Sequence, residues 1–232
     1  MTDPVIIGIA TFDGPGRRES LLESLESLAP QAEMIHVYAS DHTPVTPFEN
    51  VYAHVNTASI GDAGKFYSFA MLEMGSYYCL TCDDDLIYPP DYVERMIEGI
   101  ERYDRKAVCS FHGKAFTGKA YPWYRAQGER YPCLRTVDAD AQITIPGTGV
   151  MGWHSSLLSV SMEDFPEPNM ADIWFGKKCN DLGIPRYALA HQEGWIQHAD
   201  IDMDTTLWRV NKKDTEKTDK ITEVYNSVNW KL

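Results

Sequence analysis

The chain has 232 residues, of which 44% are hydrophobic and 24% charged, a balance that is ordinary for a single globular domain. Its formal net charge of −13 argues against non-specific binding to nucleic acid or to anionic membranes, because Lys and Arg drive such binding. We therefore expect one folded domain over residues 1–232.

The sequence contains no signal for membrane insertion or export. No apolar run approaches the roughly 20 residues that a membrane-spanning helix needs. The start Met1–Pro4 has no basic residue, and the apolar run Val5–Ala10 is too short for a signal peptide. The five cysteines are odd in number and scattered, which favours a reducing compartment. We expect a cytoplasmic protein in which Cys79 and Cys82, without a second Cys pair, are ordinary strand residues.

The first half of the chain alternates apolar strand-like runs with helical patterns. This order predicts an α/β fold in which a doubly wound sheet has helices on both faces. The expected strands are 5–10, 34–39, 51–55, 76–82 and 107–111, and the expected helices are 21–28, 61–74 and 92–100.

The second half, from about residue 114, is less regular. Residues 114–133 are rich in Gly, aromatic and basic residues, and we expect a long functional loop there. A strand at 137–145 and a turn at Gly147–Gly149 should follow. Further elements are predicted as a helix over 170–182, a short strand over 187–190 and an amphipathic final helix over 221–228.

An acidic cluster ends the expected strand 76–82. Asp83, Asp84 and Asp85 follow it directly, and a helix start marked by Pro89 and Pro90 comes next. The carboxyl ends of parallel strands are where ligands bind in open α/β sheets. Hard carboxylate oxygens there suit Mg²⁺ or Mn²⁺, ions that also bind diphosphate oxygens. The sequence thus predicts a metal–diphosphate site in this strand-to-helix loop.

Taken in order, these motifs resemble the GT-A-fold glycosyltransferases, and most closely the large inverting family 2, over roughly residues 5–200. The matching features are Ile6–Leu28, Asp41, the Gly61-x-x-Gly64-Lys65 helix start, Asp83–Asp85, Gly147–Gly149 and Met170–Asp172. The resemblance implies a GT-A (Rossmann-like) mixed, mainly parallel sheet flanked by helices. It also implies a nucleotide-sugar-binding half at about 1–113 and an acceptor-binding half at about 114–232.

The resemblance implies roles for particular residues. Asp172, at a helix start, corresponds to the general base of the family. Asp85 corresponds to the metal ligand, although the triplet leaves Asp84 as an alternative, and His198 is preferred over His191 as the residue that completes the metal shell. The expected nucleotide-sugar contacts are Thr11, Phe12, Arg17, Asp41, Gly61, Lys65, Asp83 and Asp84.

The implied reaction is an inverting transfer of one sugar from a UDP-sugar to an acceptor hydroxyl, with Mn²⁺ or Mg²⁺ on the diphosphate. A carboxylate that takes the hydroxyl proton and a cation on the leaving diphosphate suit this chemistry independently. Trp153, Trp174 and Trp195 are expected near the acceptor side. The Gln-x-x-Arg-Trp motif of many processive family 2 enzymes is absent, which favours single-sugar addition over polysaccharide synthesis.

Other interpretations stay open. Asp172 is also the kind of residue that a helix start favours without catalysis, because of the helix dipole. The loop Thr11–Arg18 loosely resembles that of sugar-phosphate nucleotidyltransferases, and the acidic loop would also suit a non-enzymatic carbohydrate- or Ca²⁺-binding module. The acceptor can be a saccharide, a lipid-linked glycan, a protein, a small molecule or a modified DNA base. The last rests on the basic residues Lys114, Lys119, Arg125, Arg130 and Arg135.

Overall fold

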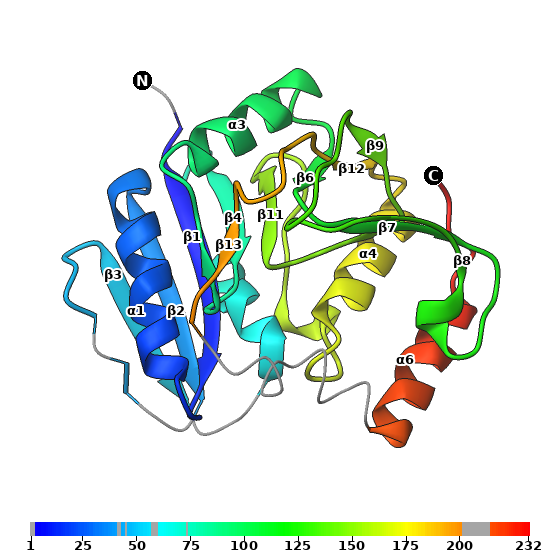
Figure 1. Ribbon diagram of the computed structural model, residues 1–232, viewed down its shortest axis with the longest axis horizontal. Helices are drawn as coiled ribbons and strands as arrows, with labels where there is room; N and C mark the ends of the chain where they lie inside the picture. The colour runs from blue at the N-terminus through cyan, green and yellow to red at the C-terminus, as the bar shows by residue number, and fades with distance from the viewer. Residues whose placement is uncertain (1–2, 41–42, 45, 57–59, 73, 201–213) are drawn as a thin grey trace.

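A mixed eight-stranded sheet forms the centre of the protein in the computed structural model (Figure 1), which describes residues 3–40, 43–44, 46–56, 60–72, 74–200 and 214–232. The strand order is β3-β2-β1-β4-β11-β6-β12-β9, and β11 runs antiparallel to both of its neighbours. The strands are β1 (Val5–Phe12), β2 (Met34–Ser40), β3 (Val51–Asn56), β4 (Tyr78–Cys82), β6 (Val108–Ser110), β9 (Ala141–Gln142), β11 (Val150–His154) and β12 (Arg186–Ala188).

Two helices, α1 (Arg17–Leu28) and α3 (Tyr92–Arg102), cover one face of the sheet. Leucines of α1 and the apolar stripe of α3 pack on alternate residues of β1 and β4, such as Ile7 and Leu80. The strands β1, β2 and β4 are largely buried on both faces, which is why their sequences show continuous apolar runs rather than alternation, whereas the edge strand β3 is mostly exposed.

The opposite face is covered by the 3₁₀ segment η2 (Gly61–Phe66), the short α2 (Tyr67–Met71) and the helix α4 (Ala171–Leu182). Phe66, Trp153 and Phe175 stack there in the core. The single helix expected over 61–74 is therefore wrong in detail, since its first turn and a half is 3₁₀ and the helix ends at Met71.

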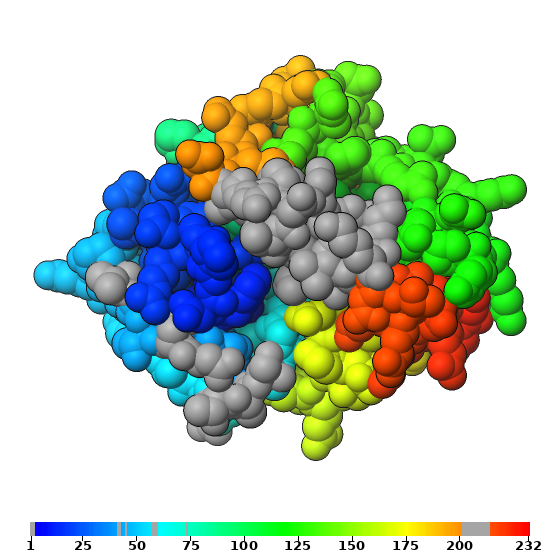
Figure 2. Space-filling model, turned by 60° about the horizontal axis from the view of Figure 1, so that its bottom comes forward, coloured from blue at the N-terminus to red at the C-terminus, as the bar shows by residue number. Residues whose placement is uncertain are grey.

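A small second sheet, β10-β7-β8, lies beside the final helix α6 (Thr215–Ser227). Its strands are β7 (Gly113–Thr117), β8 (Gln127–Tyr131) and β10 (Ile145–Pro146). The Trp123 N–H donates to Thr222 Oγ1 at 3.1 Å, and Tyr225 Oη donates to the Gly118 carbonyl at 2.9 Å. Figure 2 shows α6 (red) against this green segment on the surface. The loop expected over 114–133 is thus a β-hairpin whose tip packs on α6.

Two further expectations differ from the structure. The strand expected over 137–145 is reduced to β9 and β10 with an isolated bridge at Val137, whereas β11 follows the turn Gly147–Gly149 and was not foreseen. The strands β5 (Leu86–Ile87) and β13 (Gln197–His198) form a separate two-stranded sheet. Three short 3₁₀ turns are η1 (Ala29–Gln31), η3 (Trp123–Arg125) and η4 (Met162–Asp164). Over the described ranges, no helix is long and apolar enough to cross a bilayer.

Candidate active site

The site lies where parallel strands β1 and β4 end side by side. Their register pairs Ile9 with Cys82, so the residues that follow emerge at the same edge of the sheet. Thr11 and Phe12 end β1, and the acidic cluster Asp83–Asp85 follows β4. Because β11 is antiparallel to β4, its first residue lies at this edge as well, and the Asp83 N–H donates to the Gly149 carbonyl at 3.1 Å. The loop of the acidic cluster and the turn before β11 are therefore held together.

Asp84, the middle carboxylate, is turned into the protein. Its Oδ2 accepts from Thr11 Oγ1 at 2.7 Å, and its Oδ1 lies 2.8 Å from Arg17 Nη1. Burial raises the pKa of Asp84, and the Arg17 charge and the Thr11 hydroxyl oppose that rise. Thr11, Arg17 and Asp84 thus form a buried support beneath the cluster, with the Arg17 guanidinium also 4.5 Å from the centre of the Phe12 ring.

Asp83 is the carboxylate of the cluster that reaches the adjoining cavity, with 41% of its side chain exposed. It forms an ion pair with Lys65, whose own side chain is only 4% exposed. Burial disfavours the Lys65 ammonium, but Asp83 and Asp62 outweigh it and raise its pKa. Lys65 is thus a buried, permanently charged cation at the edge of the cavity.

Asp85 lies beside β13, which carries His198. The Ala199 N–H donates to the Asp85 carbonyl at 3.0 Å, and His198 pairs with Leu86 in the β5–β13 ladder. Burial, together with Asp83 and Asp84, raises the pKa of Asp85 to about 6, while Arg17 and His198 oppose the rise. His198 is thus close enough to Asp85 to act on it electrostatically.

No three His, Cys, Asp or Glu side chains within the described ranges are arranged to hold a metal ion unaided. The carboxylate oxygens of the acidic cluster are nevertheless of the ligand type that Mg²⁺ and Mn²⁺ prefer. Such ions are held in substrate-binding sites by one or two carboxylates, with phosphates and water filling the other positions. Asp83 pairs through one oxygen with Lys65 and Asp85 through one oxygen with Arg17, whereas both Asp84 oxygens have protein partners.

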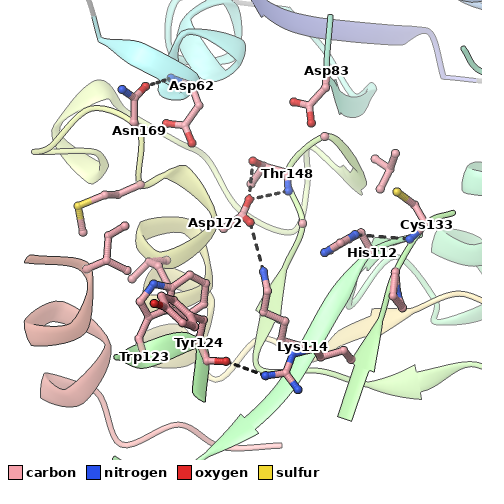
Figure 3. A pocket seen from close by; sticks show the side chains of 18 of the residues that line it. Asp62, Asp83, His112, Lys114, Trp123, Tyr124, Cys133, Thr148, Asn169 and Asp172 are labelled. Carbon is pink, nitrogen blue, oxygen red and sulfur yellow. Dashed lines mark hydrogen bonds and ion pairs between the residues drawn. The ribbon is translucent and has the colours of Figure 1, made fainter. Parts of the chain in front are cut away.

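Asp172 stands in the first turn of α4 and faces the same cavity (Figure 3). Its Oδ1 accepts from the Thr148 N–H at 2.9 Å and from Thr148 Oγ1 at 2.8 Å. Its Oδ2 lies 3.8 Å from Lys114 Nζ. Burial alone would raise the pKa of Asp172, but Lys114 and the two Thr148 hydrogen bonds outweigh it and lower the pKa. Asp172 is a fixed, ionised carboxylate with one oxygen in reach of the cavity.

A third carboxylate, Asp62, comes from η2. Its oxygens accept from the Ala171 N–H at 3.1 and 3.3 Å, so it caps the start of α4 next to Asp172. Its own N–H donates to Asn169 Oδ1 at 3.3 Å. Gly61 has a positive φ of 60°, and a Cβ there would lie 2.2 Å from Asn169 Oδ1, which makes glycine necessary. This contact ties the predicted Gly61–Lys65 motif to the predicted base helix.

Asp62, Lys65, Asp83 and Asp172 line one cavity of about 610 Å³, the size of a small-molecule site, whereas Asp85 and His198 are not among its lining residues. Figure 3 shows Asp62, Asp83 and Asp172 around it, with Lys114, Trp123 and Tyr124 at the other end. The remaining wall residues that matter for the chemistry are His112, Phe116, Arg130, Thr148, Ile173 and Ile221. The first half of the chain, the helix α4 and the hairpin β7–β8 therefore meet at a single cavity.

Several expected site residues lie elsewhere. Trp153 is fully buried in the core, so its expected place near the acceptor side is wrong, and neither Trp174 nor Trp195 lines the cavity. Trp195 lies under Arg95 near α3. His191 is buried between the Leu189 and Pro132 carbonyls, which leaves His198 as the histidine beside Asp85. Asp41 lies outside the described residues.

Known proteins match this chain in three dimensions but not in sequence. No protein-family model matches it, and no curated protein matches it. Among solved structures, GalNAc-T7 with UDP, GalNAc and Mn²⁺ superposes with a TM-score of 0.54 at 9% identity, over 97% of this chain. TarS residues 1–349 from S. aureus superpose with a TM-score of 0.53 at 14% identity, again over 97% of this chain.

The chain spans 55% of the GalNAc-T7 chain and 70% of the TarS chain. At these identities the likeness defines the fold, which is the GT-A fold of glycosyltransferases, as expected from the motifs. The mixed, mainly parallel sheet flanked by helices is therefore confirmed.

Asp62 and Lys114 are among the cavity residues that the sequence did not identify as site residues. Asp62 lies inside the Gly61-x-x-Gly64-Lys65 motif, and an acidic residue between two glycines was the available signal. Lys114 was noticed only as part of a basic stretch, because its position opposite Asp172 depends on a hairpin that was expected to be a loop.

Proposed function

We propose that the chain is a glycosyltransferase that moves one sugar from a UDP-sugar to an acceptor hydroxyl with inversion at the anomeric carbon. The observation that supports it best is the meeting of Asp83 and Asp172 in one cavity, at the ligand-binding edge of a GT-A sheet. The GalNAc-T7 structure of the same fold carries UDP, GalNAc and Mn²⁺. The closeness of a diphosphate site and a candidate base is what a sugar transfer requires.

Asp172 is the general base in this proposal. Its lowered pKa keeps it ionised at neutral pH, so it can accept the proton of the acceptor hydroxyl as that oxygen attacks the sugar. The two Thr148 hydrogen bonds hold one oxygen and fix the orientation of the carboxylate. The other oxygen, beside Lys114, is the one that takes the proton.

The donor side uses the acidic cluster and its neighbours. Asp85 and His198 would hold the divalent cation, with Asp83 near the ribose or sugar and Lys65 near the phosphates. When bound, the cation supplies positive charge to the departing diphosphate. Phe12, Gly61 and Asp41 are proposed to contact the nucleotide, while Thr11, Arg17 and Asp84 keep the cluster in place from below.

A thermal-shift panel of nucleoside diphosphates with and without Mn²⁺ tests the proposal. A ligand that binds only the native state raises the unfolding temperature, so UDP should do so and should need the metal. The absence of a shift with every nucleotide would contradict the proposal. A shift with Ca²⁺ and sugar alone would favour a binding module, and release of pyrophosphate rather than UDP would favour a nucleotidyltransferase.

Asp85→Asn should remove the metal-dependent part of the UDP shift. The matched control is Asp104→Asn, because 83% of the Asp104 side chain is exposed. Asp104 also lies outside the acidic cluster. The control should keep the full shift. An undiminished metal effect in Asp85→Asn would assign the metal to other residues.

A further inference from the structure

Two cations face each other across the hairpin strands that form one end of the cavity. Lys114 of β7 and Arg130 of β8 are direct partners in the antiparallel register, and both line the cavity. Like charges directly opposite each other on one face of a sheet destabilise it. The arrangement therefore costs stability unless a negative charge lies between or above the pair.

The described residues supply only part of that negative charge. Lys114 Nζ lies 3.8 Å from Asp172 Oδ2. Arg130 makes no ion pair with any carboxylate in the described part of the chain, and its Nη2 donates to the Tyr124 carbonyl at 2.7 Å. The other acids of the cavity, Asp62 and Asp83, are at the Lys65 end. Among the described residues, Lys114 is thus paired with Asp172, whereas Arg130, which is exposed, has no carboxylate partner.

The surroundings of the pair are aromatic and apolar. Lys114 Nζ lies 5.2 Å from the centre of the Trp123 ring, and the Arg130 guanidinium lies 4.6 Å from the centre of Phe116. Gly128 lies opposite Phe116 in the register of β7 and β8. Its φ of 132° and the nearby Ala115 carbonyl both disfavour a side chain at this position. The ring of Phe116 is therefore open to Arg130, and contact with rings holds the guanidinium in place.

We infer that the acceptor carries a monoanionic group, either a phosphodiester or a carboxylate, that Lys114 and Arg130 bind next to the accepting hydroxyl. The inference rests on the proposed function, since it places the acceptor in the cavity beside Asp172. Lys114 contacts both Asp172 and the proposed anion, so the anion lies within a few bonds of the hydroxyl that Asp172 deprotonates. Ile173 and Ile221 provide an apolar wall for the rest of the acceptor.

The structure favours a single local anion over a long polyanion such as a nucleic acid duplex. The other basic residues of this segment do not line the cavity, and Lys119 and Arg125 are exposed away from it. Arg135 is paired with Glu193 at 2.9 Å. A duplex would need a continuous basic track, whereas the acceptor end of this cavity offers one pair of cations in an acidic protein.

Matched pairs of probes test the inference on the full chain. Methyl β-glucuronide is compared with methyl β-glucoside for the carboxylate, and glycerophosphoglycerol with glycerol for the phosphodiester. Dissociation constants are measured by ligand-observed NMR with saturating UDP and Mn²⁺ and again without them. We expect at least one anionic probe to bind about tenfold more tightly than its neutral partner, as charge-assisted hydrogen bonds allow. The preferred pair identifies which anion the site takes.

Variants of the hairpin test whether the preference for anionic over neutral probes depends on Lys114 and Arg130. Arg130→Gln should abolish most of the preference, and Arg130→Lys should restore part of it, because a point charge replaces the guanidinium fork. Arg125→Gln, in the same segment but outside the cavity, should leave it unchanged. Circular dichroism of each variant shows whether it is folded.

The outcomes separate this inference from the proposed function. UDP binding without any preference for the anionic probes overturns the inference and leaves the proposed function standing. A preference that persists in Arg130→Gln overturns it as well. A preference that depends on Arg130 in a protein that does not bind UDP supports the anion site and rejects the glycosyltransferase proposal.

Discussion

Arg17 Nη1 lies 2.8 Å from Asp84 Oδ1 and 3.3 Å from Asp85 Oδ2, so one side chain from the start of α1 joins two carboxylates at the end of β4. The side chains of Arg17 and Asp84 are only 3% and 7% exposed. A cation that close and that buried offsets the repulsion within the triplet. Asp84 is therefore held inside the protein, while 41% of the Asp83 side chain and 16% of the Asp85 side chain are exposed.

The first prediction concerns this ion pair. Arg17→Gln leaves the buried Asp84 carboxylate without its cation and should lower the free energy of unfolding by about 3–5 kcal/mol. Urea denaturation measures the loss. Arg18→Gln is the control, because Arg18 and its partner Asp13 are 63% and 58% exposed and such pairs contribute about 0–1 kcal/mol. Equal losses for both variants would show that the buried pair has no special role.

The second prediction uses the closeness of Gly149 to the acidic cluster. A Cβ at position 149 would lie 1.9 Å from Asp83 Oδ2, so Gly149→Ala must displace the Asp83 carboxylate. We expect the UDP shift with Mn²⁺ to be lost at a cost in stability of about 1–3 kcal/mol, which is typical of overpacking. Gly75→Ala, where no atom lies within 4 Å of the added Cβ, should keep both stability and shift. A full UDP shift in Gly149→Ala would argue that Asp83 does not contact the donor.

The third prediction concerns Asp172. Asp172→Asn removes the proton acceptor and should lower kcat by about 10²- to 10⁴-fold while UDP still binds. Asp181→Asn is the control on the same helix, with the Asp181 side chain 52% exposed. Loss of UDP binding together with activity would mean that Asp172 has a structural role instead.

The pH profile gives a separate check on Asp172. Lys114 and Thr148 hold its pKa below the usual value of 3.8, so protonation of Asp172 should not limit the rate at pH 5 or above. Lys114→Met removes the main charge that lowers the pKa, and the acidic limb of the kcat profile should move to higher pH. A limb that stays in place would show that Lys114 does not act on the base.

The fourth prediction concerns Asp62 and stability. Burial is the main cause that raises the pKa of Asp62 to about 6, and nearby Asp172 and Asp83 add to it while Lys65 opposes it. A raised carboxyl pKa means that the folded state binds the proton more tightly than the unfolded state. The contribution of Asp62 to the free energy of unfolding is therefore fully present below about pH 4 and is lost as the pH rises through 6.

Asp62→Asn should consequently stabilise the protein on the order of 1–2 kcal/mol at pH 8, with the difference vanishing near pH 4. Unfolding in urea at a series of pH values measures it. Asp138→Asn, at an exposed position, should show no such trend. A stabilisation that is independent of pH would assign the effect to something other than the charge.

The strands β1, β2 and β4 of the first half were predictable because they are largely buried on both faces and leave continuous apolar runs. Val5–Ala10 and Met34–Ala39 fall inside β1 and β2, and the acidic cluster follows β4 as expected. The rule that ligands bind at the carboxyl ends of parallel strands then placed Asp83–Asp85 at the edge of the sheet, where β1 and β4 end in the structure.

The second half was harder because its contacts are remote in sequence. β11 reads as Val-Met-Gly-Trp-His, which has neither alternation nor a long apolar run, yet it is paired on both sides in the middle of the sheet. The hairpin β7–β8 carries polar residues on its exposed strand, and its stability comes from α6, about a hundred residues later. The positions of Trp153, Trp174 and Trp195 could not be predicted for the same reason, because only tertiary packing decides which ring lies in the core.

The antiparallel direction of β11 has a consequence for how the site can change over evolution. A strand entering the sheet from the opposite direction brings the turn that precedes it, rather than the one that follows it, to the edge where the parallel strands end. The hairpin β7–β8 comes before that turn and can vary in length or sequence while Thr148 and Gly149 remain anchored to Asp172 and Asp83. The hairpin end of the cavity can thus diverge while the end that holds Asp83 stays unaltered.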